Sequence, residues 1–516
     1  MMSVKKIKSA LLSVYHKEGL DDIVRELAAA GVKLYSTGGT LEFVRSLGVE
    51  AVAVETLTGY PSILGGRVKT LHPGVFGGIL ARREESGDAA QLSEYSIPEI
   101  DLVIVDLYPF EATVDSGASE AEIIEKIDIG GISLIRAGAK NFRDVVIVGA
   151  QAQYVELLEL LRSQECATTL EQRKRFAALA FGVSSHYDSA IFNWFNRGEG
   201  GQALPAFRVS YDGGQTLRYG ENPHQKGAFY GALPEVFEQL HGKEISYNNL
   251  LDIDAAVNLI GEFDGANGRP VFAILKHNNA CGAATGTTVL EAYERALAAD
   301  PASAFGGVLI SNKPIDEAAA AKINELFFEV ILAPDYSEAA LGLLFSKKNR
   351  IVLRLKEFAK PERQFRSLLN GVAVQDRDTK VGGADGEVKV VTKLGPTEAQ
   401  MVDLVFANKI VKQSKSNAIV LARDGQMIAS GVGQTSRVDA LRHAIEKAQN
   451  FGFGLRGAVM ASDAFFPFAD CVEIAHGEGI DTIIQPGGSV RDGDSIEYCD
   501  KHDMTMIFTG LRHFKH

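Results

Sequence analysis

Up to residue 148 the chain alternates between short apolar runs and amphipathic segments, with turn residues between them. A short apolar run bounded by turn residues predicts a buried strand, and apolar residues at helical spacing predict an amphipathic helix. Strands that alternate with helices form parallel sheets covered on both faces, so we predict an α/β domain with a parallel sheet. The predicted strands are Ile7–Val14, Val32–Tyr35, Val49–Val54, Leu102–Leu107 and Val145–Val148, and the predicted helices are Leu20–Ala30, Leu41–Leu47 and Ile132–Lys140.

A polar, glycine-rich stretch from Asn196 to Thr216 interrupts this pattern and predicts a domain boundary. The remainder again mixes strands and helices, which predicts a second α/β domain. Residues 381–386 are rich in glycine and predict an exposed loop or a junction between subdomains. The predicted elements of this part are the strands Val271–Leu275, Gly307–Ile310, Ala458–Ala461 and Thr482–Gln485, the helices Val289–Ala299 and Val438–Gln449, and a hairpin about Asp424 and Gly425.

The composition is that of an average globular protein. The 516 residues are 46% apolar and 23% charged, which is enough for a buried core in two or three domains. Acidic residues outnumber basic ones by 66 to 53, and the charge of -13 disfavours nucleic-acid and membrane surfaces, so local cations must hold any anionic ligand. The widely separated cysteines predict a reducing, cytoplasmic location. No segment approaches the roughly 18 apolar residues of a membrane helix.

Polar and glycine-rich residues follow three of the predicted strands in the first domain. In parallel sheets ligands bind beyond the carboxyl ends of the strands, so these residues predict one shared crevice. Glycine pairs let backbone N–H groups approach an anion, and serine, threonine and lysine add donors, which predicts a phosphate site. The three segments are 13–19 (SVYHKEG), 36–40 (STGGT) and 108–110 (YPF).

A basic cluster, GGRVKTLHP, occupies residues 65–73 of this acidic chain. In an extended segment, Arg67 and Lys69 would face the same side. Runs of surface charge are commonly only solvated, so a solvated basic turn is the alternative. Asp128 precedes a predicted helix that ends at Lys140, and taken alone it is more typical of a helix N-cap than of a catalytic group.

In the second domain, Lys276 and His277 directly follow a buried-looking strand. A neighbouring ammonium favours a neutral imidazole that can accept a proton, although a hydrogen-bonded structural histidine is the alternative. Segment 217–225 (LRYGENPHQ) is too polar for a core strand and predicts a recognition segment. Residues 461–468 (ASDAFFPF) place Asp463 beside three phenylalanines, which suits a flat heterocycle or, for at least one ring, ordinary core.

Eight segments of the chain resemble, in order, those of one enzyme family. They are GGRVKTLHP, DLYPF, IDIGG, LRYGENPHQ, KHNNACG, SAFGG, GVGQTSR and ASDAFFPF. On these segments the chain is identified as a member of the bifunctional family of 5-aminoimidazole-4-carboxamide ribonucleotide (AICAR) formyltransferase and IMP cyclohydrolase of purine biosynthesis. The resemblance covers essentially the whole chain, and the ordered set is far more specific than any single motif.

The resemblance implies a methylglyoxal-synthase-like cyclohydrolase domain over residues 1–200 and a transformylase region over 201–516 with two cytidine-deaminase-like subdomains. It implies transfer of a formyl group from 10-formyltetrahydrofolate to the 5-amino group of AICAR, followed by dehydrative closure of formyl-AICAR to IMP. The implied partners are therefore these nucleotides and a reduced folate, with no nucleic acid and no membrane. A homodimer with shared transformylase sites and an internal potassium ion are also implied.

In the second domain the resemblance implies that Lys276 and His277 are the catalytic pair. We predict that His277 manages the proton of the weakly nucleophilic amine, either directly or through the carboxamide, and that Lys276 stabilises the developing oxyanion, chemistry that requires no metal. The implied substrate-binding residues are Arg218, Tyr219, Gly306, Glu329, Asn417, Arg437, Asp463, Phe466 and Arg512.

In the first domain the ring closure is intramolecular, so holding the substrate in a ring-closing conformer supplies much of the rate. Lys69 with Tyr108, and Asp128 with Lys140, are the implied pairs for proton transfer and oxyanion stabilisation, and the sequence does not rank them. The implied nucleotide-binding residues are Ser13, Lys17, Ser36, Thr37, Gly38, Arg67, Thr70 and Gly130.

Two positions depart from the pattern of the family. Tyr15 replaces a serine that contributes near the phosphate, which puts that contact in doubt. Ala280 replaces a proline, which predicts a looser turn after Lys276 and His277 without removing either functional group.

Two other functions match parts of the sequence. A zinc deaminase needs an HxE motif with a paired PCxxC, and only the first half is present, at His476 and Glu478. A regulatory protein that senses a nucleotide would need the first domain alone. The adjacent Lys276 and His277 argue against this second alternative.

Overall fold

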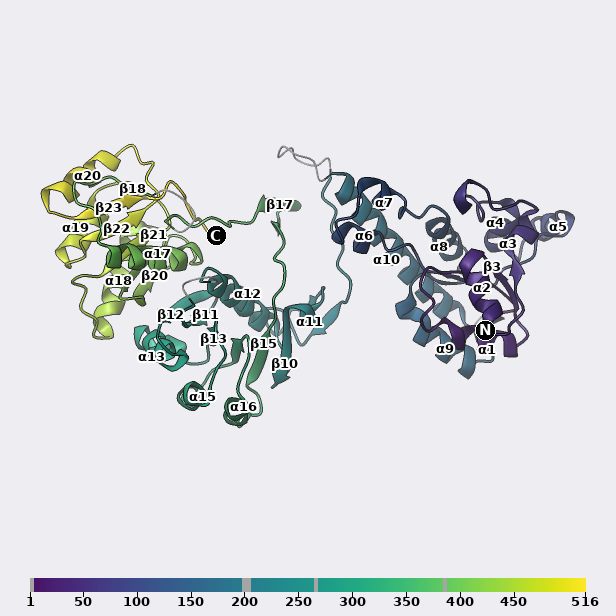
Figure 1. The fold of residues 1–516 in the computed structure, drawn as a ribbon, viewed down its shortest axis with the longest axis horizontal. Coiled ribbons are helices and arrows are strands. Elements are labelled where there is room, and N and C mark those ends of the chain that lie inside the picture. Colours follow the sequence, from purple (N-terminus) through teal and green to yellow (C-terminus); the bar gives the residue numbers. More distant parts are fainter. Residues whose placement is uncertain (1–3, 197–205, 264–267, 384–387) are drawn as a thin grey trace. The chain divides into compact units, whose positions relative to one another are not determined.

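The computed structural model describes residues 4–196, 206–263, 268–383 and 388–516. It divides the chain into two compact units, Met1–Tyr211 and Asp212–His516 (Figure 1). The boundary implied between residues 200 and 201 lies outside the described residues. The polar stretch from Asn196 to Thr216 contains the observed division.

The first unit is built on a five-stranded sheet in which every pairing is parallel, as the alternation of strands and helices predicted. Successive side chains of a strand point to opposite faces, so Leu11 belongs to one core cluster, and Ala10 and Leu12 belong to another. The strand order is β4 (Val52–Ala53), β3 (Lys33–Ser36), β2 (Ser9–Ser13), β5 (Leu102–Val105) and β6 (Val146–Val148), and a separate ribbon pairs β1 (Lys5–Lys6) with β7 (Ala167–Thr168).

Helices cover both faces of this sheet, and α10, the longest helix, packs against α8 and β6. The helices are α1 (Leu20–Ala29), α2 (Gly38–Ser46), α3 (Val54–Thr58), α4 (Pro73–Leu80), α5 (Ser86–Glu94), α6 (Phe110–Asp115), α7 (Glu120–Ile124), α8 (Gly130–Lys140), α9 (Tyr154–Ser163) and α10 (Leu170–Phe195), with short 3-10 turns η1 (Leu64–Gly66) and η2 (Gln151–Gln153).

Two local predictions for this unit are wrong. The strand predicted over Val49–Val54 is reduced to β4, because Val54 already begins α3. The basic segment 65–73 is not extended: η1 and consecutive turns occupy it, and Gly65 and Gly66 adopt φ angles of 66° and 85°. A φ in this range is open to glycine at no steric cost, so the glycine pair sets a compact turn.

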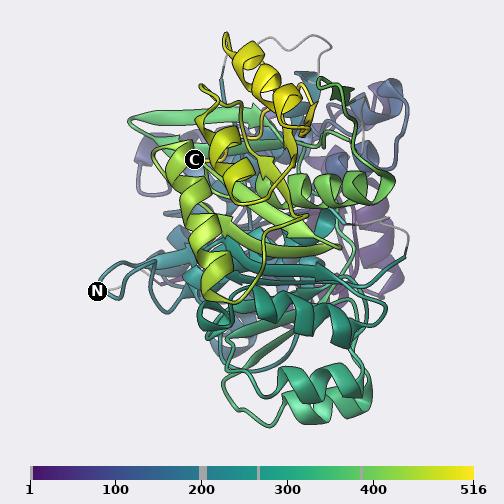
Figure 2. The ribbon, with the colours of Figure 1, turned by 90° about the vertical axis from the view of Figure 1, so that its left-hand side faces the viewer.

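The second unit contains one twelve-stranded mixed sheet (Figures 1 and 2). Its strand order is β10 (Phe237–His241), β15 (Ile351–Leu355), β14 (Val330–Ala333), β13 (Val308–Ser311), β11 (Val271–Lys276), β12 (Asn279–Thr285), β20 (Gln426–Gly431), β19 (Ile419–Arg423), β21 (Val459–Ser462), β22 (Thr482–Gln485), β23 (Thr505–Phe508) and β18 (Lys389–Val390). Two hairpins stand apart from it: β8 (Gln215–Leu217) with β9 (Gly227–Phe229), and β16 (Arg363–Leu368) with β17 (Gly371–Asp376).

This sheet is a duplication. Strands β11 to β15 repeat in the same order, with the same parallel and antiparallel pairings, as β19 to β23. The two halves join where β12 meets β20, at the antiparallel pair Ala284 and Gln426. In Figure 2 the teal half lies below the green and yellow half. The likeness of each half to a cytidine deaminase stays a prediction.

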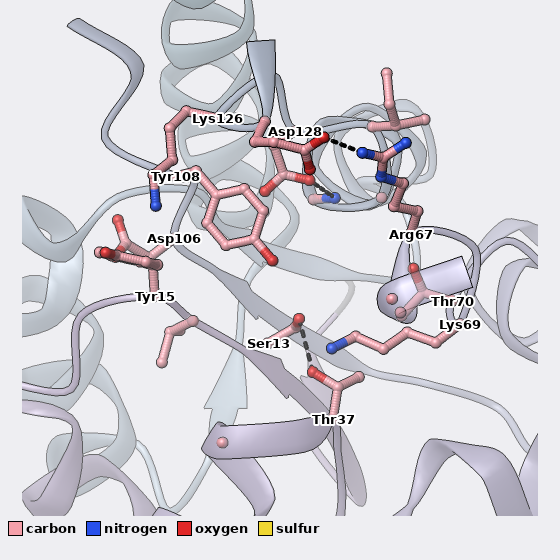
Figure 3. A pocket seen from close by; sticks show the side chains of 18 of the residues that line it. Ser13, Tyr15, Thr37, Arg67, Lys69, Thr70, Asp106, Tyr108, Lys126 and Asp128 are labelled. Atoms are coloured by element: carbon pink, nitrogen blue, oxygen red, sulfur yellow. Dashed lines mark hydrogen bonds and ion pairs between the residues drawn. The ribbon is translucent and has the colours of Figure 1, made fainter. Parts of the chain in front are cut away.

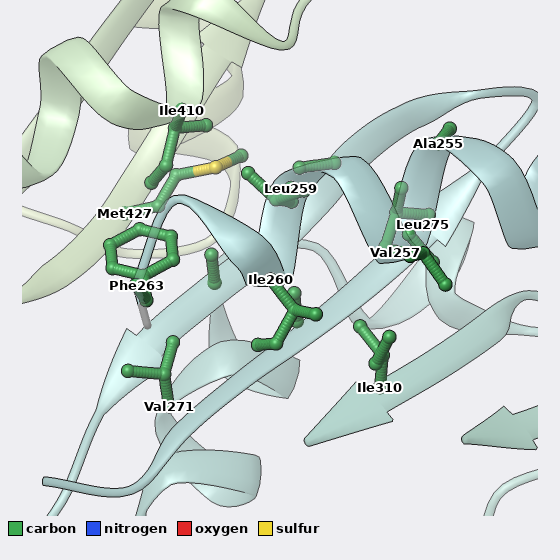
Figure 4. Close-up of a cluster of buried hydrophobic side chains, with 14 of the residues drawn as sticks. Ala255, Val257, Leu259, Ile260, Phe263, Val271, Leu275, Ile310, Ile410 and Met427 are labelled. Atoms are coloured by element: carbon green, nitrogen blue, oxygen red, sulfur yellow. The ribbon is translucent and has the colours of Figure 1, made fainter. Parts of the chain in front are cut away.

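One layer of helices spans both halves. Leu259, Ile260 and Phe263 from the first half lie in a single apolar cluster with Ile410 and Met427 from the second (Figure 4). The other face of the sheet has a separate core in each half. The helices of this unit are α11 (Leu233–Val236), α12 (Tyr247–Gly261), α13 (Val289–Ala299), α14 (Pro301–Ala304), α15 (Glu317–Ile323), α16 (Glu338–Leu344), α17 (Glu398–Lys412), α18 (Arg437–Asn450), α19 (Asp470–Gly477) and α20 (Asp492–Lys501).

The loop predicted at 381–386 is exposed neither at Val381 nor at Gly382, and residues 384–386 lie outside the described residues. Asp424 and Gly425 form the predicted hairpin turn, with φ angles of 53° and 69°. Within the described ranges, no helix is both long and apolar enough to span a membrane.

A glycine in each half lets a strand lie directly against the helix that follows it. A Cβ on Gly282 would lie 1.9 Å from the carbonyl oxygen of Ala296 in α13, and a Cβ on Gly431 would lie 1.8 Å from that of Ala440 in α18. Backbone atoms cannot move aside as a flexible side chain can. The strand and helix would therefore have to separate if either glycine gained a side chain.

We expect Gly431→Ala to lower the free energy of unfolding by about 2 kcal/mol or more, because the added methyl group overpacks this contact. The measurement is the midpoint of thermal unfolding. Gly454→Ala is the matched control, since a Cβ at Gly454 meets nothing within 4 Å. Equal midpoints for the two variants would contradict the assigned close contact.

Candidate functional site

The first unit contains a cavity of about 1070 Å³ at the carboxyl ends of β2, β3 and β5 (Figure 3). Three segments that follow these strands contribute to it, which is the arrangement predicted from the sheet. The turns at 64–70 and the segment leading into α8 complete the lining. The predicted site residues that line it are Ser13, Lys17, Thr37, Arg67, Lys69, Thr70, Tyr108, Asp128 and Gly130.

One end of the cavity is suited to an anion. The hydroxyls of Ser13 and Thr37 lie 3.0 Å apart, and the Lys69 side chain reaches toward them from the opposite wall (Figure 3). The Lys69 ammonium lies 3.3 Å from where a Cβ on Gly38 would be, so a side chain at Gly38 would crowd it. Lys17 donates to the carbonyl oxygens of Val14 and Tyr15, at 2.9 and 2.6 Å. These donors and cations form a local positive site within an acidic chain.

The other end holds a carboxyl and a phenol. Asp128 Oδ1 accepts from the backbone N–H of Gly131 at 2.6 Å and so caps the start of α8. Burial raises the pKa of Asp128 above its ordinary value, although this hydrogen bond and the charge of Lys69 oppose the shift. Burial, together with the charge of Asp128, also raises the pKa of Tyr108, so its phenol remains a proton donor at neutral pH.

Three predicted residues of the first unit do not line the cavity. Ser36 is fully buried and donates to the carbonyl oxygen of Leu12 at 3.0 Å, because neighbouring residues of a strand point to opposite faces and Thr37 takes the cavity side. Gly38 leaves room for the Lys69 ammonium. Lys140 is the last residue of α8. A helical rise of about 1.5 Å per residue puts it roughly 15 Å from the helix start, and the pairing of Asp128 with Lys140 stays a prediction.

Sequence reasoning missed Asp106, Glu125 and Lys126, which also line the cavity. Glu125 forms an ion pair with Arg67. Asp106 and Lys126 each lie two residues before a predicted site residue, Tyr108 and Asp128. This neighbourhood is the one signal in the sequence that could have identified them.

In the second unit, Lys276 and His277 lie at a tight hairpin turn. Lys276 ends β11, and the two turn residues, His277 and Asn278, have φ angles of 49° and 65°. Asp252 Oδ1 accepts from the backbone N–H of Asn278 at 2.7 Å and so fixes the turn. The turn is closed by pairing of Lys276 with Asn279, and Ala280 pairs with Leu275, after which the register shifts. The looser turn expected from Ala280 stays a prediction.

The Lys276 ammonium is fixed by two backbone carbonyls. It donates to the carbonyl oxygens of Phe305 and Gly306, at 2.8 and 3.1 Å. An ammonium has three protons, so one donor remains for a ligand. The exposed rings of Phe305 and Phe327 lie 4.9 Å apart beside this point and offer an aromatic surface.

Arg437, Asn417 and Asp463 form a buried polar cluster in the second half of the sheet. Arg437 Nη2 donates to Asp463 Oδ1 at 2.7 Å and to Asn417 Oδ1 at 3.0 Å. Its Nε donates to the Ser462 hydroxyl at 2.9 Å. Asp463 is fully buried, and its Oδ2 has no hydrogen-bond partner among the described residues.

Hydrogen bonds bring these two groups together. Asn279, which follows the His277 turn, accepts from the backbone N–H of Lys415 at 2.9 Å, two residues before Asn417. His513 donates its backbone N–H to the Asp463 carbonyl oxygen at 2.9 Å, which brings the neighbouring Arg512 to the same region. The structure thus joins residues 276–279, 415–417, 437, 463 and 512 at one end of the sheet.

Other predicted residues of this unit make separate contacts. Arg218 donates to the Tyr219 hydroxyl at 2.7 Å, and Glu329 accepts from Lys243 at 2.6 Å. The ring of Phe466 is fully buried in the core beside α18 and α19, so its predicted contact with substrate is not available to the side chain. The expectation that at least one phenylalanine of this segment is core is confirmed.

The zinc-deaminase motif is not assembled into a metal site. His476 packs against Tyr498 and His502, and Glu478 accepts from Gln449 at 3.0 Å. Over the ranges that the structure describes, no group of three or more histidine, cysteine, aspartate or glutamate residues could hold a metal ion.

Comparison with known proteins covers the whole chain. A family model described as "AICARFT/IMPCHase bienzyme" matches residues 138–447, and one described as "MGS-like domain" matches residues 19–133. A "Bifunctional purine biosynthesis protein PurH" from Bacteroides thetaiotaomicron is 64% identical over 516 residues, with 100% of both chains covered. Proteins of the same name from Chlorobium phaeovibrioides and Aquifex aeolicus are 44% and 45% identical, covering 100% and 98% of this chain and 100% of each relative.

The raised pKa of Asp128 predicts a pH-dependent stability. A carboxyl with a raised pKa binds its proton more tightly in the folded state, so its contribution to stability falls as pH rises from about 3.9 through the folded pKa. Asp128→Asn keeps an oxygen for the Gly131 N–H but carries no charge. We expect it to raise the thermal midpoint above that of wild type at neutral pH and to lose this advantage near about pH 4.

The measurement is the midpoint of thermal unfolding as a function of pH. Asp128→Ala is the control, because it removes the helix cap as well as the charge and costs about 1 kcal/mol. Parallel pH profiles for wild type and Asp128→Asn would contradict a raised pKa at this residue.

Proposed function

Because the chain belongs to the AICARFT/IMPCHase bienzyme family, we propose that its two units divide the reactions of these enzymes between them. The chain is a bifunctional enzyme of purine biosynthesis that transfers a formyl group to AICAR and closes the product to IMP. An MGS-like domain begins it, and this membership excludes the deaminase and sensor alternatives. We assign ring closure to the cavity of the first unit and formyl transfer to the end of the sheet at His277.

The assignment of ring closure is supported by the meeting of Lys69, Tyr108 and Asp128 in one cavity. The phosphate of formyl-AICAR binds at Ser13, Thr37 and Lys69, and the base extends toward Tyr108 and Asp128. The carboxamide nitrogen attacks the formyl carbon, and the formyl oxygen leaves as water, which takes up in net one proton from the carboxamide nitrogen and one from the formamido nitrogen. The protonated Tyr108 phenol can donate to that oxygen, and binding in the ring-closing conformer supplies the proximity.

The assignment of formyl transfer is supported by the fixed geometry of Lys276 and the exposed turn that presents His277. The family implies a folate-type donor, and we propose 10-formyltetrahydrofolate. The amine of AICAR attacks the formyl carbon, His277 takes the amine proton, and the remaining proton of the Lys276 ammonium stabilises the oxyanion. Tetrahydrofolate then leaves with a proton on its nitrogen.

Reciprocal variants test this division. We expect His277→Ala to lower formyl transfer by about 100-fold or more while cyclisation of supplied formyl-AICAR continues, since a general base contributes at least that factor. We expect Lys69→Ala to lower cyclisation of supplied formyl-AICAR while formyl transfer continues. Both activities are followed in each variant, by tetrahydrofolate release and by IMP formation. Loss of both activities in either variant, or of neither, would contradict the assignment.

We also propose the homodimer that the family implies, with the β16–β17 hairpin in its interface. All residues of both strands are exposed, and Val372 and Val374, on one face of β17, are 45% and 42% exposed. An arm with apolar side chains on its surface is suited to burial against a second copy of the chain.

Val374→Asp tests the interface. We expect the variant to sediment as a monomer and to lose formyl transfer, because a buried unpaired carboxylate is costly and the transformylase site is shared. Gln375→Asp is the matched control, since the same charge then lies on the opposite face of the strand. An unchanged dimer in Val374→Asp would exclude this hairpin from the interface.

An internal potassium ion fits beside Asp463. Its buried Oδ2 lacks a partner among the described residues, and hard cations prefer oxygen ligands of this kind. The ion would neutralise the carboxylate that orients Arg437. We propose a cytoplasmic location, because all four cysteines are buried free thiols.

A further inference from the structure

An ammonium lies against two tyrosine rings in the wall of the first unit's cavity. The rings of Tyr15 and Tyr108 meet edge to face, with centroids 5.5 Å apart and an interplanar angle of 87°. Lys126 Nζ lies 5.2 Å from the centroid of Tyr15 and 5.7 Å from that of Tyr108. Figure 3 shows the three residues on the side of the cavity opposite Arg67 and Lys69. We call Tyr15, Lys126 and Tyr108 the tyrosine–lysine cluster.

One carboxylate links the two chain segments that carry the tyrosines. Asp106 Oδ2 accepts from the backbone N–H of His16 at 2.8 Å and lies 2.6 Å from Nδ1 of the His16 ring. Asp106 thus ties the residue after Tyr15 to the end of β5, two residues before Tyr108. This contact keeps the two rings together even though they come from segments more than 90 residues apart.

The backbone of Lys126 is fixed by a hydrogen bond of its own. Its carbonyl oxygen accepts from the Tyr187 hydroxyl at 2.7 Å, and the same hydroxyl accepts from the backbone N–H of Asp128 at 2.7 Å. One buried hydroxyl therefore fixes the backbone of both Lys126 and Asp128.

The Tyr108 ring depends on these neighbours. Tyr108 is 40% exposed, and within the described ranges no hydrogen bond holds its hydroxyl. A cation over an aromatic face and an edge-to-face ring pair each favour one orientation of the ring. Without them, the exposed phenol would sample several rotamers.

We propose that Tyr15 and Lys126 are positioning residues of ring closure, which hold the Tyr108 phenol toward the reacting formyl oxygen. This inference rests on the proposed role of Tyr108. It also gives Tyr15 a function on the base side of the substrate, in place of the phosphate contact that a serine makes at that position.

Four variants test the cluster: Tyr15→Ser and Lys126→Met, which remove its contacts, and Tyr15→Phe and Lys126→Arg, which keep a ring or a cation. We expect the first two to lower kcat for cyclisation of formyl-AICAR by about five- to tenfold with little change in KM, as the loss of contacts of this strength implies. Tyr15→Phe and Lys126→Arg restore most of that kcat.

The controls separate positioning from general damage. Tyr95→Ser and Lys174→Met make the same changes at exposed residues away from the cavity, and formyl transfer in the same protein measures the second unit. Because Tyr15 and Lys126 act through one phenol, Tyr15→Ser and Lys126→Met together lower kcat less than the product of the single effects.

Three outcomes overturn the inference. They are an unchanged kcat in both Tyr15→Ser and Lys126→Met, a Tyr15→Phe enzyme as slow as Tyr15→Ser, and independent effects in the double variant. Tyr108→Phe distinguishes these from a failure of the proposed function. If Tyr108→Phe keeps the wild-type kcat, the role of Tyr108 itself is wrong. If it is slow and the Tyr15 and Lys126 variants are not, only the positioning inference fails.

Discussion

Parallel pairing of β2, β3 and β5 is the constraint on which the first site depends. Parallel strands all end at the same edge of the sheet, so the segments after them must meet there. The chain places hydroxyls after β2 and β3 and a phenol after β5, and the sheet alone brings them to one cavity. The cations come from turns outside the sheet. The cavity therefore carries a local cluster of cations, although the net charge of the chain is negative.

The sequence predicts this first site well where a residue follows a strand, and poorly elsewhere. Ser13, Thr37 and Tyr108 were identified because strand ends are visible in the apolar pattern. Ser36 precedes the cavity-lining Thr37 by one residue. Because successive side chains of a strand point to opposite faces, the Ser36 side chain is buried on the face away from the cavity. Lys140 lies at the far end of α8 from Asp128, so the length of the helix separates the two residues along its axis. The compact turn at 65–73 depends on the positive φ angles of Gly65 and Gly66, which the pattern of apolar and polar residues does not predict.

The second site shows a different limit. The family resemblance identified Lys276, His277, Asn417, Arg437 and Asp463, but no local pattern predicts that they meet. Their proximity follows from the pairing of β12 with β20, which joins two halves distant in sequence. The buried ring of Phe466 illustrates the same point, because an aromatic residue beside a functional carboxylate has the same sequence signature in a core as in a site.

The duplicated sheet contains two copies of one carboxylate-and-turn arrangement. Asp252 in α12 binds the backbone of the turn at His277 and Asn278, and Asp403 in α17 binds the backbone N–H groups of Asp424 and Gly425, each at 2.7 Å. In the second copy, Arg295 covers the turn by donating to the Asp424 carbonyl oxygen. The two turns have similar backbone angles, with φ of 49° and 65° at His277 and Asn278 and of 53° and 69° at Asp424 and Gly425. The duplicated scaffold therefore presents an imidazole at one hairpin turn and a carboxylate followed by glycine at the other.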